Sequence, residues 1–189
     1  MLPSKHKPSL WTDRLVAEMA TAPQHLISEQ EYLNTTYRPD CDYVDGFILE
    51  RNVGTPPHAR LQTLILAWLV AHELHWRMQV LAECRLKIRD RKYRIPDIMV
   101  LPADAPRPEL VIEQAPLLCI EVVSPRDRLA HLVERAGDYL DLGVPETWIC
   151  DPRKKNCWIY SDQGTVESSD AVLRHNQIEL PIAELFGQL

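Results

Sequence analysis

Two acidic residues stand inside stretches of sequence that are otherwise apolar. Asp97 lies in Arg94-Ile95-Pro96-Asp97-Ile98-Met99-Val100-Leu101, and Glu121 lies in Leu117-Leu118-Cys119-Ile120-Glu121-Val122-Val123. Runs of this kind are typical of strands covered on both faces, so neither carboxylate has an aqueous face available to it. Burying an ionised carboxylate without a partner costs several kcal/mol even after relaxation. Each acid therefore needs a proton, a cation or a metal ion.

The chemistry that these acids could perform depends on whether they act alone or as a pair. For a single buried acid, a helix cap or an arginine partner is the simpler explanation. For two acids on strands that are expected to be adjacent, a divalent-metal site is the better interpretation. Mg²⁺ fits best, with Mn²⁺ as a substitute, because oxygen ligands and water complete its octahedron. Zinc is disfavoured, since the chain has no H-E-x-x-H motif and no cysteine pair at ligand spacing. A metal held by carboxylates activates water and stabilises charge on a phosphoryl group, which indicates phosphodiester hydrolysis.

Periodic patterns on either side of the acids predict the elements that position them. The residues from Val80 to Arg89 alternate between apolar and charged, which predicts one strand. Ser124-Pro125-Arg126-Asp127 predicts the start of a helix that ends at Gly143, and residues 146–151 and 157–160 predict two further strands. A long helix is expected from about residue 56 to Trp76, because apolar residues recur there at helical spacing: Leu61, Leu64, Ile65, Trp68 and Leu69.

Two short signals precede this core. Ser28-Glu29-Gln30-Glu31 fits a capping box and predicts a short helix. Asp45-Gly46 stands between two short apolar runs and predicts a β-hairpin. The residues before them carry only one weak helical pattern. We therefore expect a peripheral arm over residues 1–25 and a single domain over residues 26–189.

Composition limits the classes of protein that fit. The chain has 189 residues, 46% of them hydrophobic and 25% charged, which is typical of one globular domain. The longest apolar stretch falls well short of the roughly 20 residues of a membrane span, and no apolar secretion signal begins the chain, so we expect no membrane partner and a cytoplasmic location. The five cysteines form no C-x-x-C pair and are expected to be reduced. The net charge of -6 argues against a protein whose main task is to coat nucleic acid.

A set of ordered motifs resembles the Uma2 family of restriction endonuclease-like proteins, which belongs to the PD-(D/E)XK nuclease superfamily. The resemblance covers nearly all of the chain after about Leu26. It implies an α/β fold with an αβββαβ core, a mixed central sheet flanked by helices, an N-terminal helix and hairpin and a C-terminal β extension, together with a divalent metal. The motifs are Asp42-Tyr43-Val44-Asp45-Gly46, His58, Arg94-Ile95-Pro96-Asp97, Ile120-Glu121-Val122-Val123-Ser124-Pro125, and Tyr139 to Asp151 with Gly143-Val144-Pro145-Glu146 and Trp148.

The resemblance also implies roles for individual acids and for one histidine. Asp97 and Glu121 would be metal ligands. Asp42 would be a further ligand or a supporting acid, and it stands where the family usually has a longer glutamate. His58, at the start of the first core helix, would orient water or contact phosphate. Its alternative role is a local hydrogen bond at the helix start.

One residue of the superfamily pattern is missing. The position two residues after the second acid is normally lysine, and here it is Val123. Members of the resembling family often supply the cation from the following helix, four residues before a tyrosine, and here that position is Arg135. Arginine carries the charge but stays protonated, so it cannot accept a proton from water. The alternative role of Arg135 is an ion pair with a core carboxylate. Lys87 is a second candidate cation, on a strand face expected to be solvated.

Three functions remain open on the sequence. The leading hypothesis is a Mg²⁺-dependent endonuclease that cleaves DNA. The alternative is a nuclease-fold module that has lost catalysis and acts through binding or as a homodimer, which is favoured by Arg135 in place of lysine, Asp42 in place of glutamate and the negative net charge. A hydrolase acting on a smaller phosphate ester fits the same residues.

Overall fold

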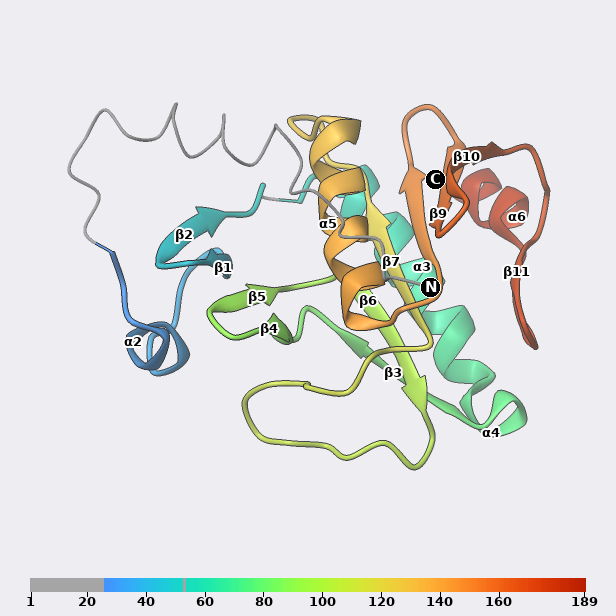
Figure 1. Ribbon diagram of the computed structural model, residues 1–189. Coiled ribbons are helices and arrows are strands. Elements are labelled where there is room, and N and C mark those ends of the chain that lie inside the picture. Colours follow the sequence, from blue (N-terminus) through green and yellow to red (C-terminus); the bar gives the residue numbers. More distant parts are fainter. Residues whose placement is uncertain (1–25, 53) are drawn as a thin grey trace, which may run out of the picture.

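The computed structural model describes residues 26–52 and 54–189, so the predicted arm of residues 1–25 lies outside the described residues. A six-stranded, a four-stranded and a two-stranded sheet combine with helices (Figure 1). In chain order the elements are α2 (Glu29–Leu33), β1 (Cys41–Val44), β2 (Phe47–Glu50), α3 (Pro56–Ala71), α4 (Glu73–Trp76), β3 (Met78–Ala82), β4 (Leu86–Arg89), β5 (Lys92–Arg94), β6 (Ile98–Pro102), β7 (Leu118–Val122), α5 (Leu129–Leu142), β8 (Thr147–Asp151), β9 (Asn156–Ser161), β10 (Gly164–Ser168), β11 (Leu173–His175), β12 (Ile178–Leu180) and α6 (Ile182–Gly187).

The six-stranded sheet forms the centre of the fold, with the strand order β10-β9-β8-β7-β6-β3. β7 and β8 are parallel and the other neighbours are antiparallel, so the sheet is mixed. The connection between the two parallel strands is α5, since parallel neighbours require a crossover. The core elements follow one another as α3, β3, β6, β7, α5 and β8. The predicted fold class, a mixed central sheet flanked by helices, is confirmed.

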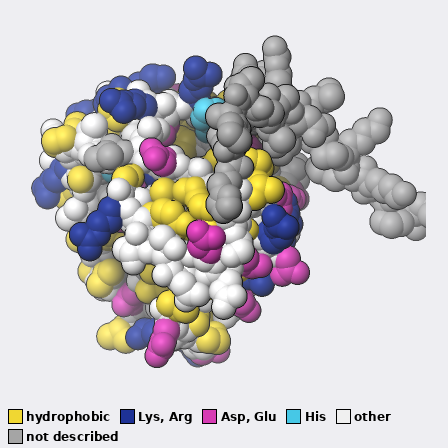
Figure 2. All heavy atoms as spheres, turned by 90° about the vertical axis from the view of Figure 1, so that its left-hand side faces the viewer, with side chains coloured by type: hydrophobic (Ala, Val, Ile, Leu, Met, Phe, Trp, Pro, Cys, Tyr) yellow, Lys and Arg dark blue, Asp and Glu magenta, His cyan; other side chains and the backbone are white. Residues whose placement is uncertain are grey.

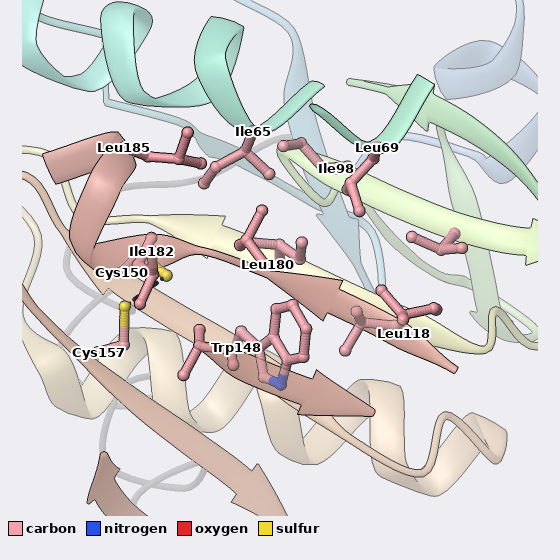
Figure 3. Close-up of a cluster of buried hydrophobic side chains, with 14 of the residues drawn as sticks. Ile65, Leu69, Ile98, Leu118, Trp148, Cys150, Cys157, Leu180, Ile182 and Leu185 are labelled. Atoms are coloured by element: carbon pink, nitrogen blue, oxygen red, sulfur yellow. Dashed lines mark hydrogen bonds between the residues drawn. The ribbon is translucent and has the colours of Figure 1, made fainter. Parts of the chain in front are cut away.

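Alternation along the strands divides the side chains of this sheet between two helices. Met99 of β6 and Cys119 of β7 pack in one cluster with Tyr139 of α5. The alternate positions face the other side, where they meet α3 and α6 (Figure 3). Because successive residues of a strand point to opposite faces, α3 and α5 cover opposite faces of the sheet (Figure 1). The second group includes Ile65, Leu69, Ile98, Leu118, Trp148, Cys150, Leu180, Ile182 and Leu185.

The four-stranded antiparallel sheet, ordered β2-β1-β5-β4, is tied to α5 by charge. Lys92 and Arg94 of β5 both form ion pairs with Asp138 of α5. The predicted hairpin is confirmed: Asp45 and Gly46 join β1 to β2 with φ values of 51° and 103°, as a tight hairpin turn requires. The predicted helix at its side is α2, where the Ser28 side chain accepts a hydrogen bond from the backbone of Glu31.

The single strand predicted from Val80 to Arg89 is wrong. The chain forms β3 in the central sheet, turns, and enters the second sheet as β4. Glu83 has a φ of 52°, a left-handed conformation that breaks the extended backbone immediately after β3. The alternating pattern therefore continues across a change of sheet and does not mark a single strand.

The run from Arg94 to Leu101 is likewise two strands instead of one. β5 ends at Arg94 and β6 begins at Ile98, and the two belong to different sheets. Pro96 lies in the connection, where its missing N–H cannot disrupt a strand ladder. Asp97 consequently lies directly before β6, at the edge of the central sheet, and not inside a strand.

Two predicted helices and the C-terminal extension also differ from the structure. Ser124 to Asp127 form a hydrogen-bonded turn, in which the Ser124 N–H donates to Asp127 Oδ2 at 2.7 Å, so α5 begins only at Leu129. The helix expected to reach Trp76 is divided into α3 and the short α4. The chain beyond β10 is not purely β, because α6 follows the β11–β12 hairpin. The predicted end of α5 is correct: Gly143 caps it with a φ of 109°.

Two further features concern the cysteines and the helices of the described residues. Cys41, Cys84, Cys119, Cys150 and Cys157 are all free thiols. Over residues 26–52 and 54–189, no helix has both the length and the apolar character needed to cross a membrane.

Candidate active site

The two carboxylates of the sequence analysis lie beside each other at one edge of the central sheet. Antiparallel pairing places Ile98 of β6 opposite Ile120 of β7, so Asp97 and Glu121 are the next residues along. Their exposed fractions are 2% and 1%. Both nevertheless line one cavity of about 250 Å³, whose lining includes residues of the loop between β2 and α3. The two acids are therefore buried and adjacent as expected, although Glu121 lies within β7 and Asp97 directly precedes β6.

Asp97 is held by three donors. Its Oδ2 accepts a hydrogen bond from the Val122 N–H at 2.7 Å and lies 3.3 Å from His58 Nε2. Its Oδ1 forms an ion pair with the Arg51 guanidinium. Burial alone would raise the pKa of Asp97, but the hydrogen bond from His58 and the positive charge of Arg51 outweigh it and lower this pKa to about 2. Asp97 is therefore an anion throughout the physiological pH range.

Glu121 has a different environment on the same edge. Its Oε1 accepts a hydrogen bond from the Tyr139 hydroxyl at 2.5 Å and lies 3.0 Å from Arg135 Nη2. No described residue donates a hydrogen bond to its Oε2. Burial raises the pKa of Glu121 to about 7 in spite of the opposing charge of Arg135, and the charge of Asp97 adds to the rise. The pair thus combines a permanent anion with a carboxyl that gives up its proton near neutrality.

Arg135 reaches Glu121 from α5, as the resemblance implies for the missing lysine. Its Nη2 donates to the Ile95 carbonyl at 2.6 Å as well as facing Glu121, so the guanidinium is fixed from two sides. Its Nε is buried and has no hydrogen-bond partner among the described residues. Val123, at the position of the absent lysine, packs in an apolar cluster with Leu132 of α5.

Asp42 lies behind Arg135 and not in the cavity of the two acids. Its Oδ2 accepts from Arg94 Nη1 at 2.9 Å, its Oδ1 accepts from the Ile95 N–H at 3.0 Å, and Arg135 Nε is 3.7 Å away. Burial opposes the ionisation of Asp42, but the charges of Arg135 and Arg94 lower its pKa. In these contacts Asp42 orients two arginines, and its metal role stays a prediction.

His58 lies in the first turn of α3 and is 6% exposed. Its Nε2 faces Asp97, and its Nδ1 is buried without a partner among the described residues. A Cβ at Gly54 would lie 3.0 Å from this Nδ1, so glycine lets the preceding loop approach the imidazole. Burial would lower the pKa of His58, but the hydrogen bond and the charge of Asp97 raise it.

Arg51 is the residue of this site that the sequence analysis missed. It follows β2 directly, and its side chain is 15% exposed. It lines the cavity of Asp97 and Glu121 and also a second cavity of about 270 Å³ between the β1–β2 hairpin and α5. Its position after the Asp-Gly hairpin is the only signal in the sequence, and that signal does not identify Asp97 as its partner.

Other candidates lie away from the cavity. Lys87 is on β4 in the second sheet and pairs with Asp90 at 3.1 Å, in agreement with a solvated face. Trp148 is fully buried in the core. Asp151 accepts hydrogen bonds from the backbone of Arg153 and Lys154 and so holds the β8–β9 turn.

The donor set at the cavity fits one magnesium ion. Among residues 26–52 and 54–189, no three His, Cys, Asp or Glu side chains come together as a metal site. Mg²⁺ commonly takes only one or two carboxylates, and water or substrate oxygens complete its octahedron. Asp97 and Glu121 supply this number, and Glu121 Oε2 has no donor from the described residues. Each acid also has one arginine beside it in this cavity, Arg51 beside Asp97 and Arg135 beside Glu121.

Charge is mixed on the face of the molecule that carries α2 and the β1–β2 hairpin (Figure 2). Lys and Arg side chains are interspersed with Asp and Glu over the coloured part of this view. This distribution agrees with the net charge of -6 and with a modest non-specific attraction for polyanions.

Comparisons with known proteins support the fold. Residues 29–187 match the profile of the Uma2 family, described as "Putative restriction endonuclease". A crystal structure of a protein from Anabaena variabilis, described as a "putative nuclease belonging to DUF820", has a similar fold, with a TM-score of 0.75 and 22% sequence identity over 85% of this chain and 98% of that chain. Among proteins with curated descriptions, none matches the chain. With the match extending over most of its length, the chain belongs to the Uma2 family.

Proposed function

We propose that the protein is a Mg²⁺-dependent nuclease that hydrolyses phosphodiester bonds of DNA. One observation carries the proposal: two buried carboxylates, Asp97 and Glu121, share a cavity with Arg51, His58 and Arg135. Arg51 Nε and His58 Nδ1 are buried and have no hydrogen-bond partner among the described residues. Carboxylates attract a cation, and unpaired guanidinium and imidazole nitrogens attract an anion. A phosphodiester with its metal ion brings both charges to one place. Membership of a family described as restriction endonucleases supports the same conclusion.

Asp97 and Glu121 are the residues that would hold Mg²⁺, with Mn²⁺ able to replace it. When bound, the ion supplies a Lewis acid that activates water and neutralises charge on the phosphoryl group. Asp97 is ready for a cation at any physiological pH because its pKa is about 2. Glu121 must lose a proton, since its pKa is about 7. Metal binding is therefore expected to release a proton below neutral pH.

Arg135 and His58 have separate roles in the proposal. Arg135 is fixed against the Ile95 carbonyl and Glu121, so it places a permanent positive charge beside the scissile phosphate at no cost of reorientation. It cannot act as a base. His58 orients Asp97 through Nε2, and its unpaired Nδ1 is available to a water molecule or to a phosphate oxygen.

The test is nicking of supercoiled plasmid DNA in Mg²⁺, in Mn²⁺ and in EDTA. We expect cleavage by the wild-type protein in either metal and none in EDTA. Asp97→Asn and Glu121→Gln should abolish cleavage while circular dichroism shows a folded protein, and Glu184→Gln, an exposed change of the same kind on α6, should cleave normally. Calorimetric titration with both metals accompanies the assay. A wild-type protein that binds neither ion and nicks no DNA would contradict the proposal.

A second candidate function is supported by the two arginines. Because Arg51 pairs with Asp97 and Arg135 with Glu121, the buried acids already have cations and need no metal for charge balance. A nuclease-fold module that acts by binding, or as a homodimer, would keep such a site without cleavage. Light scattering tests the homodimer. Cleavage that is absent in the wild-type protein but appears in Arg135→Lys would identify a silenced catalytic site.

A further inference from the structure

Both carboxylate oxygens of Asp97 already have partners. Oδ2 is shared by the Val122 N–H at 2.7 Å and by His58 Nε2 at 3.3 Å, and Oδ1 is paired with Arg51. A magnesium ion sits about 2.1 Å from its oxygen ligands and tolerates little distortion. The Arg51 guanidinium on Oδ1 repels a metal ion that approaches the same oxygen. Metal binding at Asp97 is therefore favoured when this positively charged partner leaves.

Of the three partners, Arg51 is the one free to move. The Val122 N–H belongs to the backbone of β7, and His58 lies on α3 with 6% exposure. Arg51 lies outside any strand or helix, directly after β2. Its guanidinium has a bond to Asp97 alone among the described side chains, and its Nε is without a partner.

Arg135 provides the contrast within the same site. It donates to the Ile95 carbonyl at 2.6 Å, lies 3.0 Å from Glu121 and 3.4 Å from the Tyr139 hydroxyl. If one of these contacts is lost, the other two still hold the Arg135 guanidinium in position. The site thus contains one fixed arginine and one that depends on a single carboxylate.

We infer that Arg51 is an exchangeable counter-ion, which occupies the metal position on Asp97 and, once an ion displaces it, binds a phosphate of the substrate. The inference rests on the proposed function. The displaced side chain has space, because Arg51 lines both the cavity of the two acids and the adjoining cavity beside α5. It also explains how the Asp97 anion can be balanced by Arg51 when no metal ion is bound and can still accept one. The guanidinium then moves from the carboxylate to a phosphate of the substrate.

The proposal predicts opposite effects of one substitution on two binding equilibria. Arg51→Gln should bind Mn²⁺ more tightly, by about tenfold, because a positive charge in contact with the ligand oxygen is removed. The same variant should bind a DNA oligonucleotide more weakly, by about tenfold, because a phosphate contact is lost. A general disturbance of the fold would weaken both.

The experiment measures Mn²⁺ binding by calorimetry and oligonucleotide binding by fluorescence anisotropy in Ca²⁺, using wild type, Arg51→Gln, Arg51→Lys and Arg153→Gln. Arg153 lies in the exposed β8–β9 turn and controls for the loss of one charge. Arg51→Lys keeps the charge and should stay close to wild type in Mn²⁺ affinity. The inference is supported if Arg51→Gln is the one variant in which Mn²⁺ affinity rises while oligonucleotide affinity falls. It is also supported if Arg51→Gln binds Mn²⁺ and the wild-type protein does not. Equal Mn²⁺ affinity in wild type and Arg51→Gln overturns it and leaves the proposed function standing, whereas no Mn²⁺ binding by any variant overturns both.

Discussion

Glu121→Gln should make the metal-free protein more stable at alkaline pH. Glu121 is 1% exposed, and burial raises its pKa from 4.5 to about 7 on folding. A group whose pKa is raised in the folded state contributes its full stability below the unfolded value and loses it as the pH rises through the folded value. The wild-type protein therefore loses stability between about pH 4.5 and pH 7 because of this one carboxyl.

The magnitude follows from the two pKa values. At about 1.4 kcal/mol for each unit of pKa, the ionised Glu121 costs about 3 kcal/mol of folding free energy at alkaline pH. Glutamine has the shape of the protonated acid, and its amide oxygen can still accept the hydrogen bond of Tyr139. We expect the variant to be more stable than wild type by about 3 kcal/mol near pH 8 and to match it within about 1 kcal/mol near pH 4.5.

Urea unfolding followed by tryptophan fluorescence, in EDTA at both pH values, measures this difference. Glu184→Gln on the surface of α6 is the control and should follow wild type at each pH. A Glu121→Gln protein that is less stable than wild type near pH 8 would refute the reasoning, because the ion pair with Arg135 would then outweigh burial. Adding Mg²⁺ should narrow the gap by stabilising only the wild-type protein.

Three further perturbations have defined outcomes. Asp97→Asn should destabilise the protein by about 2 kcal/mol at neutral pH, because the lowered pKa of Asp97 stabilises the fold only while the carboxyl is ionised. The difference in free energy of unfolding should shrink as the pH falls from 3.8 toward about 2, and urea unfolding at several pH values measures this difference. Gly143→Ala should cost about 1 kcal/mol in thermal unfolding, since its φ of 109° strains any L side chain. Arg85→Ala should loosen α2, because Arg85 donates to the Leu33 and Thr35 carbonyls and lies 4.4 Å above the Tyr32 ring. Amide hydrogen exchange should become faster over residues 29–33 and stay unchanged in β7, and an equal increase in both segments would contradict this expectation.

The sequence by itself determined the burial of the two acids and the elements around them. Continuous apolar runs identified β6 and β7, and the register of these strands then brings Asp97 and Glu121 together. Capping and turn residues identified α2, the hairpin and the end of α5, because those signals act over a few residues. The resemblance to the Uma2 family indicated Arg135 of α5 as the cation, and this side chain lies 3.0 Å from Glu121.

Only the tertiary structure decided which partner each charge has. Arg51 and Asp97 are 46 residues apart. They meet because β1 of the hairpin pairs with β5, where Arg94 binds both Asp42 of β1 and Asp138 of α5. The same packing takes Asp42 out of the cavity and turns the chain at Glu83 from one sheet into another. The periodic pattern of apolar residues indicates which side chains are buried. It does not indicate which charged residue from a distant part of the sequence lies next to a buried acid. A buried acid can be neutralised by a proton, an arginine or a metal, and the choice depends on where the packed elements place their side chains.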